Sequence, residues 1–393
     1  MDAGENMPTR TRRSLTRRTF LAASAATIAA TKLPAQAHAG ENLVYIGSTD
    51  NKDSDKGIHA ALWNPQAGTL SDLRLVAPLA SAGFLAASNA AGKRVLFAGH
   101  QSAPKVGAFS SYRIEPTGEL KPIGTTTAPN VDMVHLALDR TRLCLIAASY
   151  GSGKILSVKV SPDGHLSEPV SQLQLSGHGP NAARQAAPHA HGVAIAPNNR
   201  FVYINDLGTD RIMAYKLNAA TAELTPNDPP FFALAPGSGP RHLAFHPNGK
   251  WAYSINELDS TITLFQWNAA SGALTVLANT PTLLPGGDVA NNRAGEVVFD
   301  AAGRFLYACN RGVIEELVSY SIGANGHLTL IGHTPLGGKE ARHFALSPDG
   351  RFLLVAEQFT NRVSIFSRDR KTGVLTPTPV QYPVNGASCV LFA

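Results

Sequence analysis

The chain has few of the features by which many enzyme classes are recognised. Its 393 residues include only three cysteines, Cys144, Cys309 and Cys389, and no C-x-x-C pair. Each cysteine lies in an apolar run, which indicates a buried structural thiol rather than a disulfide framework. The motifs G-x-S-x-G, H-E-x-x-H, G-x-x-x-x-G-K-[ST] and a strand-linked G-x-G-x-x-G are all absent. These absences argue against a serine hydrolase elbow, a zincin, a P-loop enzyme and a Rossmann oxidoreductase.

The chain also lacks a basic body. Its net charge is +6, but residues 1–39 contain six basic and two acidic residues. The other residues contain 28 basic and 26 acidic side chains, a net charge of only +2. Nucleic acid is therefore not an expected partner. With 44% hydrophobic and 16% charged residues, the composition is that of a folded globular protein.

Residues 1–39 resemble an export signal. Arg17-Arg18 precede a weakly apolar run at 20–30, and Ala35-Gln36-Ala37 and Ala37-His38-Ala39 are of the A-x-A cleavage type. The run is shorter than the roughly 20 residues of a membrane span, and no cysteine follows it, so neither membrane insertion nor a lipid anchor is expected. We predict a twin-arginine-type signal peptide that engages the twin-arginine export machinery and gives a periplasmic or secreted protein. The alternative is a disordered basic tail.

The remaining residues contain a sevenfold repeat. In each copy a turn precedes a run of β-branched and aromatic residues, and the copies start 47 to 58 residues apart. A second marker, a Gly- or Ala-rich hairpin that ends in leucine, also occurs seven times, and no long amphipathic helix interrupts the pattern. Short strands at a period near 50 residues predict an all-β, seven-bladed β-propeller over 40–393, with one four-stranded blade per repeat. The first marker of the seven copies begins at Leu43, Arg94, Leu143, Phe201, Trp251, Phe305 and Phe352.

The two ends of the repeat region indicate how the ring closes. Six copies have a strand before the first marker, but the copy at Leu43 has none. A surplus strand-like run, 388–393, stands at the C-terminus. We predict that this run completes blade 1 and leaves no exposed sheet edge there. The chain is expected to form one domain and to be a monomer.

The positions of the strands in each repeat predict which residues lie at one rim of the propeller's central channel. The start of each inner strand and the end of the next strand meet at the same rim, because the two strands are antiparallel. Arginine binds carboxylate or phosphate with a planar fork, histidine transfers protons near neutral pH, and glutamate can orient histidine. The side chains expected at this rim are His100, His191, Arg241, Glu257, Arg311 and Arg342.

Structural roles compete with these functional ones. His191, close to His189, could bind a metal, pack structurally or act on substrate, and Arg241 and Arg311 could bind an anion or form salt bridges between blades. Glu257 could transfer protons or pair with Arg241. Structural pairing is favoured for Arg342 and His100.

Several segments resemble the seven-bladed β-propeller lactonase family, which includes 6-phosphogluconolactonase and the 3-carboxymuconate lactonizing enzyme. The resemblance covers about residues 42–393. It implies a catalytic site of His191 (or His189), Arg241, Glu257 and Arg311. The segments that carry it are Gly179-Pro180-Asn181, Arg184-Gln185, Pro188-His189-Ala190-His191, Asp206-Leu207-Gly208, Gly239-Pro240-Arg241-His242, Phe245–Gly249, Asn256-Glu257-Leu258 and Asn310-Arg311-Gly312.

The leading hypothesis is therefore a metal-independent lactonase without a cofactor, which hydrolyses a small anionic lactone, sugar-derived or carboxylated. His191 is expected to be the general base and Glu257 to orient it, while Arg241 and Arg311 hold the anionic group and the oxyanion. His189, Arg342 and His100 are the weaker candidates, and where they do not serve structural pairing they are expected to bind substrate. Two alternatives stay open: a carboxymuconate-type cycloisomerase, and a periplasmic propeller that only binds a ligand.

Overall fold

The computed structural model describes residues 42–49, 56–90 and 93–393, together with Met1. The chain divides into two units, Met1–His38 and Ala39–Ala393, and the fold described below belongs to the second. The predicted signal peptide at 1–39, apart from Met1, lies outside the described residues.

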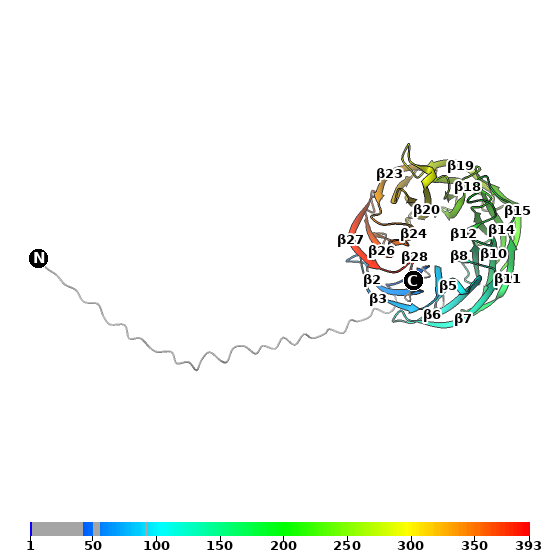
Figure 1. The fold of residues 1–393 in the computed structure, drawn as a ribbon, viewed down its shortest axis with the longest axis horizontal. Coiled ribbons are helices and arrows are strands. Elements are labelled where there is room, and N and C mark those ends of the chain that lie inside the picture. The colour runs from blue at the N-terminus through cyan, green and yellow to red at the C-terminus, as the bar shows by residue number, and fades with distance from the viewer. Residues whose placement is uncertain (2–41, 50–55, 91–92) are drawn as a thin grey trace. The chain divides into compact units, whose positions relative to one another are not determined.

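Seven four-stranded antiparallel sheets are arranged radially around a centre (Figure 1). The strands β8, β12, β20, β24 and β28 lie innermost in that view, and β3, β7, β11, β15, β19, β23 and β27 lie at the periphery. The described residues contain one 3-10 turn, η1 (Val289–Asn291), and no helix long and apolar enough to cross a membrane. The strands, blade by blade, are β28 (Ala387–Phe392), β1 (Leu43–Ser48), β2 (Ile58–Asn64) and β3 (Thr69–Ala77); β4 (Ala80–Ala90), β5 (Lys93–Ala103), β6 (Val106–Ile114) and β7 (Leu120–Pro129); β8 (Met133–Leu138), β9 (Cys144–Ser149), β10 (Lys154–Val160) and β11 (Leu166–Gln174); β12 (Ala190–Ile195), β13 (Phe201–Asp206), β14 (Arg211–Asn218) and β15 (Glu223–Ala233); β16 (Pro240–Phe245), β17 (Trp251–Asn256), β18 (Thr261–Trp267) and β19 (Leu274–Pro281); β20 (Asn292–Phe299), β21 (Phe305–Gly312), β22 (Glu316–Ile322) and β23 (Leu328–Pro335); and β24 (Ala341–Leu346), β25 (Phe352–Glu357), β26 (Arg362–Arg368) and β27 (Leu375–Pro383).

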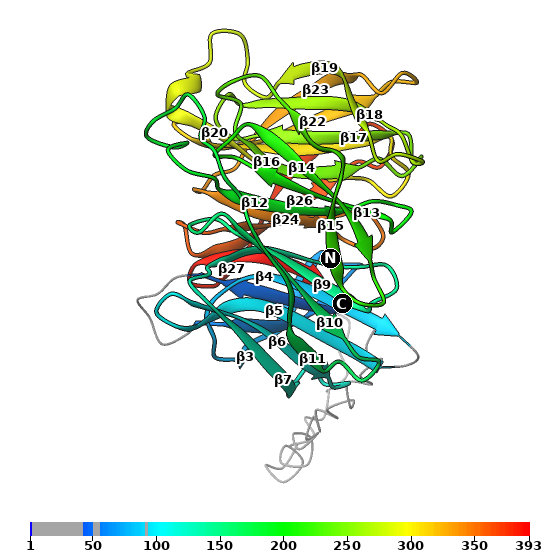
Figure 2. The ribbon, with the colours of Figure 1, turned by 90° about the vertical axis from the view of Figure 1, so that its right-hand side faces the viewer.

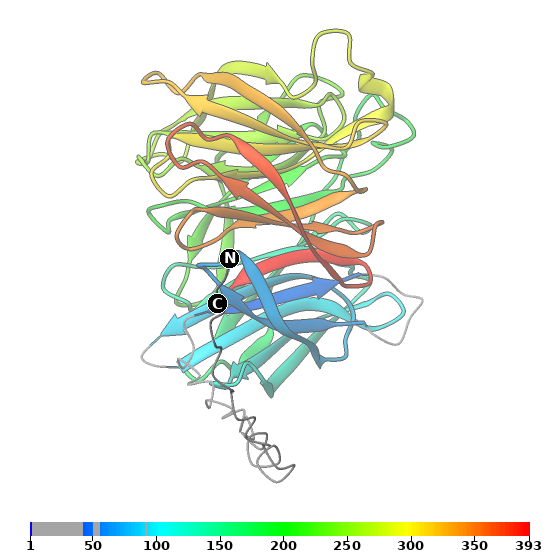
Figure 3. The ribbon, with the colours of Figure 1, turned by 90° about the vertical axis from the view of Figure 1, so that its left-hand side faces the viewer.

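The hydrophobic core lies between the blades. Figures 2 and 3 view the ring edge-on from opposite sides and show the sheets of adjacent blades lying face to face. Seven clusters of buried residues occur, and each combines residues of two neighbouring blades. The second strands are buried on both faces, whereas an outer strand such as β19 is largely exposed. Each blade therefore depends on both of its neighbours for the burial of its apolar surface.

The two sequence markers meet across the interfaces between blades. The hydroxyl of Tyr203, in the first marker of blade 4, donates to the carbonyl of Gly272, in the hairpin of blade 5, at 2.6 Å. Tyr307 makes the equivalent bond to Gly373 at 3.0 Å. Gly272 has a φ of +74°, and a Cβ at this position would lie 2.6 Å from the Phe201 ring. The glycine and the aromatic residues therefore recur in the repeat because they contact each other across the interface between adjacent blades.

The predicted closure of the ring is confirmed. β28 pairs with β1 in antiparallel register, with Ile46 opposite Val390 and Tyr45 opposite Leu391. β28 is the innermost strand of blade 1, whose sheet order is β28-β1-β2-β3. The fold is the seven-bladed propeller that the repeats predicted.

Each innermost strand contains an irregularity at the same rim. In β12, β16 and β24 the strand pairing skips one residue, and the skipped residues are His191, Arg241 and Arg342. The corresponding skip in β8 falls on Val134, in β28 on Ser388, and in β20 and β4 it spans more than one residue. A β-bulge changes the direction of a side chain relative to a regular strand. The bulges therefore determine which side chains face the channel.

Deletion of residues 386–393 should prevent the ring from closing, because it removes β28 and exposes the buried faces of blades 1 and 7. We expect loss of the cooperative unfolding transition in urea, followed by circular dichroism, in the otherwise full-length chain. As a matched control, the same eight residues are inserted directly before Asn42 through an Asn-Gly turn, since the end of β28 lies beside the start of β1. This control should restore the transition; a normal transition in the deletion variant would contradict the prediction.

Candidate functional site

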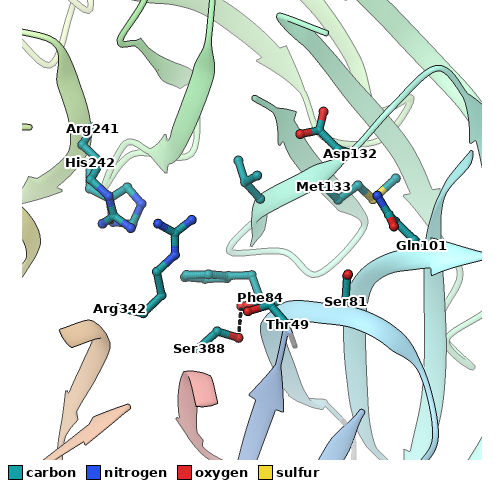
Figure 4. A pocket seen from close by; sticks show the side chains of 12 residues that line it. Thr49, Ser81, Phe84, Gln101, Asp132, Met133, Arg241, His242, Arg342 and Ser388 are labelled. Atoms are coloured by element: carbon teal, nitrogen blue, oxygen red, sulfur yellow. Dashed lines mark hydrogen bonds between the residues drawn. The ribbon is translucent and has the colours of Figure 1, made fainter. Parts of the chain in front are cut away.

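A cavity of about 190 Å³ opens at the bulged ends of the innermost strands. Figure 4 shows Arg241, His242 and Arg342 on one side of it, Asp132 and Gln101 on the other, and Phe84 between them. Its volume is below the roughly 300 Å³ at which pockets for drug-sized ligands begin, so a small metabolite fits it better. The residues lining it are Thr49, Ser81, Gly83, Phe84, Gln101, Asp132, Met133, Val134, Arg241, His242, Arg342 and Ser388.

Arg241 is a fully buried cation with incomplete hydrogen bonding. Its Nη1 donates to the carbonyl of Gly295 at 2.7 Å, its Nε lies 3.4 Å from Oε2 of Glu257, and that Nε has no hydrogen-bond partner. Burial, together with the positive charges of Arg311 and Arg342, lowers the pKa of Arg241 to about 9. A bound anion would stabilise the charged form of this side chain.

Glu257 joins arginines from three separate segments. Its Oε2 accepts from Arg311 Nη2 at 3.1 Å and lies near Arg241, while its Oε1 accepts from Arg184 Nη2 at 2.6 Å. Burial raises the pKa of Glu257, but Arg311, Arg241 and Arg184 outweigh burial and bring the pKa to about 2. The carboxylate is therefore ionised and holds the arginine cluster in place.

Arg311 is held more firmly than Arg241. It bridges Glu257 and Glu340, the latter at 2.5 Å, and Glu340 also accepts from Arg293. Burial lowers the pKa of Arg311, but the two carboxylates outweigh it and raise the pKa above its usual value. The structure thus brings together Arg241, Glu257 and Arg311, which sequence analysis had placed at one rim.

Arg342 lines the cavity with an uncompensated guanidinium. Within the part of the chain that the structure describes, it forms no ion pair, and Figure 4 shows it extending between Phe84 and the Arg241–His242 pair. Burial and the charge of Arg311 lower its pKa. The sequence analysis favoured structural pairing for Arg342, and this geometry instead favours contact with a ligand.

His191 lies beside this cluster in a dry environment. It is 2% exposed, and its Nδ1 has no hydrogen-bond partner. Burial and the neighbouring Arg241 hold its pKa well below the usual range, so the imidazole is neutral. No hydrogen bond between Glu257 and His191 exists in the described residues. The expected orientation of His191 by Glu257 is therefore not supported, because arginines occupy both carboxylate oxygens.

The other two expected histidines lie in different surroundings. His189 stacks on Tyr150 with 4.3 Å between ring centroids, and its Nδ1 lies 2.9 Å from the Tyr150 carbonyl oxygen. His100 hydrogen-bonds Ser110 inside blade 2 at 2.8 Å, and the next residue, Gln101, lines the cavity instead. Successive residues of a strand point to opposite faces, so the substrate-binding role expected for His100 is not supported.

Sequence analysis missed several residues of the site. His242 lines the cavity and pairs with Glu296, and Arg184 reaches Glu257 from the loop before β12. Arg184 and His242 both fall within segments that carry the family resemblance, which was the available signal. His242 was missed because strict strand alternation would point it away from Arg241. The bulge at Arg241 removes that alternation.

In the described residues, no group of three or more His, Cys, Asp or Glu side chains is arranged to hold a metal ion. The donors that do converge are guanidinium groups and neutral imidazoles. Such a set can bind an anion, accept a proton and stabilise a developing oxyanion.

Comparison with known proteins adds independent findings. Residues 43–392 match the family model described as "Lactonase, 7-bladed beta-propeller". The chain is 32% identical to a 6-phosphogluconolactonase of Formosa agariphila over 88% of this chain and 98% of the relative. It is 30% identical to a 6-phosphogluconolactonase of Bacillus subtilis over 88% of this chain and 97% of the relative.

Solved structures give the same picture. A putative 6-phosphogluconolactonase from Bacteroides fragilis superposes with a TM-score of 0.82 at 30% identity, covering 90% of this chain and 98% of that one. A periplasmic gluconolactonase of Pseudomonas aeruginosa also gives 0.82, at 28% identity, covering 89% of this chain and 98% of that one.

The site should make the protein sensitive to acid. Burial lowers the pKa of His191 and brings that of His242 to about 4, so below pH 6.5 the unfolded chain binds protons that the folded chain does not. The free energy of unfolding should therefore fall between pH 7.5 and 5.5, by about 1 kcal/mol for each of these histidines. Below about pH 4.5, protonation of Glu257 in the unfolded chain should extend the loss, because its folded pKa is about 2.

Urea unfolding at the two pH values measures this loss. His191→Gln should reduce it, whereas His327→Gln, at an exposed position, should leave it unchanged. Equal pH dependence in wild type and His191→Gln would contradict the prediction for this histidine.

Proposed function

Because this chain belongs to the seven-bladed β-propeller lactonase family, we propose that it hydrolyses a small sugar-derived lactone that carries an anionic group. The proposal follows the activity named for its relatives, 6-phosphogluconolactonase. The observation that carries it is the Arg342 guanidinium, which faces the cavity beside Arg241 without a carboxylate partner among the described residues.

The electrostatics of the cavity favour an anionic ligand. Arg241 is buried and Arg342 partly buried, both lie close to further positive charge, and both have lowered pKa values. A phosphate or carboxylate placed between them would supply the missing negative charge and accept hydrogen bonds from two guanidinium forks. Asp132 and Gln101 lie on the opposite wall and can hydrogen-bond the hydroxyl groups of a sugar lactone (Figure 4).

The residues divide the proposed work between them. Arg241 and Arg342 hold the anionic group and stabilise the oxyanion of the tetrahedral intermediate. Arg311 is fixed by Glu257 and Glu340 and keeps Arg241 in position through their shared Glu257. A neutral imidazole removes a proton from the attacking water, and two imidazoles are available here, the expected His191 and the neighbouring His242. His189, which is stacked on Tyr150, is kept in this proposal as a further substrate contact.

We also propose that the protein is exported, as the Arg17-Arg18 leader predicts. A structural relative that is named as a periplasmic gluconolactonase supports this location. An exported enzyme would act on lactones formed outside the cytoplasm.

Replacement of Arg342 by Gln should raise KM for 6-phosphogluconolactone about 10- to 100-fold, because a charge-assisted hydrogen bond to a buried anion is lost. The effect on unphosphorylated gluconolactone should be much smaller, as measured by pH-stat titration. Arg351→Gln removes an exposed arginine that pairs with Asp349 and should change neither value. An equal loss for both lactones would contradict the role of Arg342 in binding the anionic group, and no turnover of any lactone by the wild type would refute the proposed function.

An isotope experiment distinguishes hydrolysis from isomerisation. In ¹⁸O-water, hydrolysis should label the product carboxylate, whereas ring isomerisation would not.

Substitution of Lys for both Arg17 and Arg18 should retain the full-length chain in the cytoplasm, since twin-arginine export requires the guanidinium pair. Cell fractionation in a bacterium with this export system measures the result. Lys in place of both Arg10 and Arg12 makes the same two charge-conserving substitutions outside the pair and should leave export intact. Unchanged export of the first variant would contradict the assignment of the leader.

A further inference from the structure

The channel holds a buried histidine–carboxylate pair that sequence analysis did not predict. His242 Nδ1 lies 3.0 Å from both carboxylate oxygens of Glu296, across the interface between blades 5 and 6. Both side chains are about 5% exposed. The His242 ring also lines the 190 Å³ cavity next to Arg241 and near Arg342 (Figure 4). The pair therefore connects the interior of the channel to the proposed substrate site.

The hydrogen bonds determine which ring nitrogen carries the proton. An ionised carboxylate only accepts hydrogen bonds, so His242 Nδ1 must donate to Glu296. The backbone N–H of Val297 also donates to Glu296 Oε1 at 2.9 Å and helps to fix this carboxylate. Burial raises the pKa of Glu296, but His242 and His343 outweigh burial and keep the pKa below its usual value. Nε2 of His242 is left with its lone pair free and has no hydrogen-bond partner.

His191 lacks the carboxylate partner and the place in the cavity wall that His242 has. No carboxylate bonds either of its ring nitrogens in the described residues, its Nδ1 is unpartnered, and it is not among the residues that line the cavity. Its ring packs edge-on against Tyr150 and His242, with centroids 5.6 and 5.1 Å away. These contacts suit a residue that shapes the wall behind the base.

We propose that His242 is the general base of lactone hydrolysis and that Glu296 is its positioning residue, an inference that rests on the proposed function. The arrangement is that of a histidine whose Nδ1–H is held by a carboxylate, while Nε2 is buried and keeps a free lone pair that can accept a proton from a water admitted with the substrate. It assigns the base to an imidazole beside Arg241, the residue proposed to stabilise the oxyanion.

The step balances without any further reactant. His242 Nε2 takes a proton from water as the water oxygen bonds to the lactone carbonyl carbon, and the C=O electron pair moves onto the carbonyl oxygen near Arg241 and Arg342. When the intermediate collapses, the C=O bond re-forms and the bond from this carbon to the ring oxygen breaks. The proton on His242 passes to the ring oxygen, which becomes a hydroxyl group. The new carboxylic acid releases its own proton to water.

The charges around His242 tune its basicity. Arg241 Nη1 lies 3.4 Å from its Nδ1, and burial with the opposing effects of Glu296 and Arg241 brings its pKa to about 4. The imidazole is therefore already unprotonated at neutral pH, and Glu296 raises the basicity that burial and Arg241 lower. The titratable and charged groups that face it are Arg241 on its own strand, His135 on β8, His191 on β12, Glu296 on β20, and Arg342 and His343 on β24.

The test compares full-length variants in steady-state assays with the phosphorylated lactone. His242→Gln should lower kcat about 10²- to 10⁴-fold with little change in KM, since this is the usual contribution of a general base. Glu296→Gln keeps shape and hydrogen bonding but removes the negative charge, and should lower kcat about 10- to 100-fold. His135→Gln, in the same layer of the channel, is the matched control and should stay within about threefold of wild type.

The pH profile separates a positioning role from a structural one. Glu296→Gln should move the acidic limb of kcat/KM to lower pH, because loss of the carboxylate lowers the pKa of His242. His191→Gln should leave that limb in place. If His242→Gln does not fold, the isosteric Glu296→Gln still tests the proposal, through its lower kcat and through the shift of the acidic limb of its kcat/KM profile.

The outcomes distinguish the two proposals. If His191→Gln abolishes kcat while His242→Gln and Glu296→Gln retain it, His191 is the base and this inference is overturned, although the lactonase function stands. If the wild type hydrolyses no lactone, the proposed function fails and the assignment of the base fails with it.

Discussion

Antiparallel pairing of β28 with β1 is the constraint on which the rest of the structure depends. The core lies between blades rather than within them, so a blade without both neighbours would expose an apolar face. The site has the same dependence, because its side chains come from innermost strands far apart in sequence. Met133 on β8 and Arg342 on β24 line the same cavity only while the ring is closed. One hydrogen-bonded strand pair therefore maintains both the stability and the geometry of the site.

Within the closed ring, the β-bulges at one rim determine which side chains line the cavity. A regular strand would send Arg241 and His242 to opposite faces, whereas the observed bulge lets both line the cavity. The same irregularity in β24 frees Arg342 from the pairing of its strand. The bulge recurs around the ring, so several blades each place one residue at the same position of the rim. The type of residue at that position then determines the local charge.

The architecture could be predicted from the sequence because the repeated residues are those that form contacts between blades. Each tyrosine of the first marker that bonds a glycine in the next blade needs both partners, so both leave a periodic trace. The residues at the rim were predictable in part, because the antiparallel order of the strands places Arg241, Glu257 and Arg311 at the same end of the channel. The partners of these residues were not predictable. Arg184 reaches Glu257 from an irregular loop, His100 points into its own blade, and His242 depends on a bulge that no periodic pattern records.

The charge distribution ties stability and the proposed catalysis together. Burial, together with the neighbouring Arg241, lowers the pKa of His191 and His242, which keeps these imidazoles unprotonated and able to accept a proton at neutral pH. Burial and the neighbouring arginines likewise leave Arg241 with a pKa of about 9, so keeping this cation charged carries an electrostatic cost. Binding of an anionic lactone would relieve that cost at the moment when the oxyanion needs stabilising. Arg342, which lines the cavity and has no carboxylate partner among the described residues, would be stabilised most by such a ligand, and this is the physical reason to favour an anionic ligand over a neutral one.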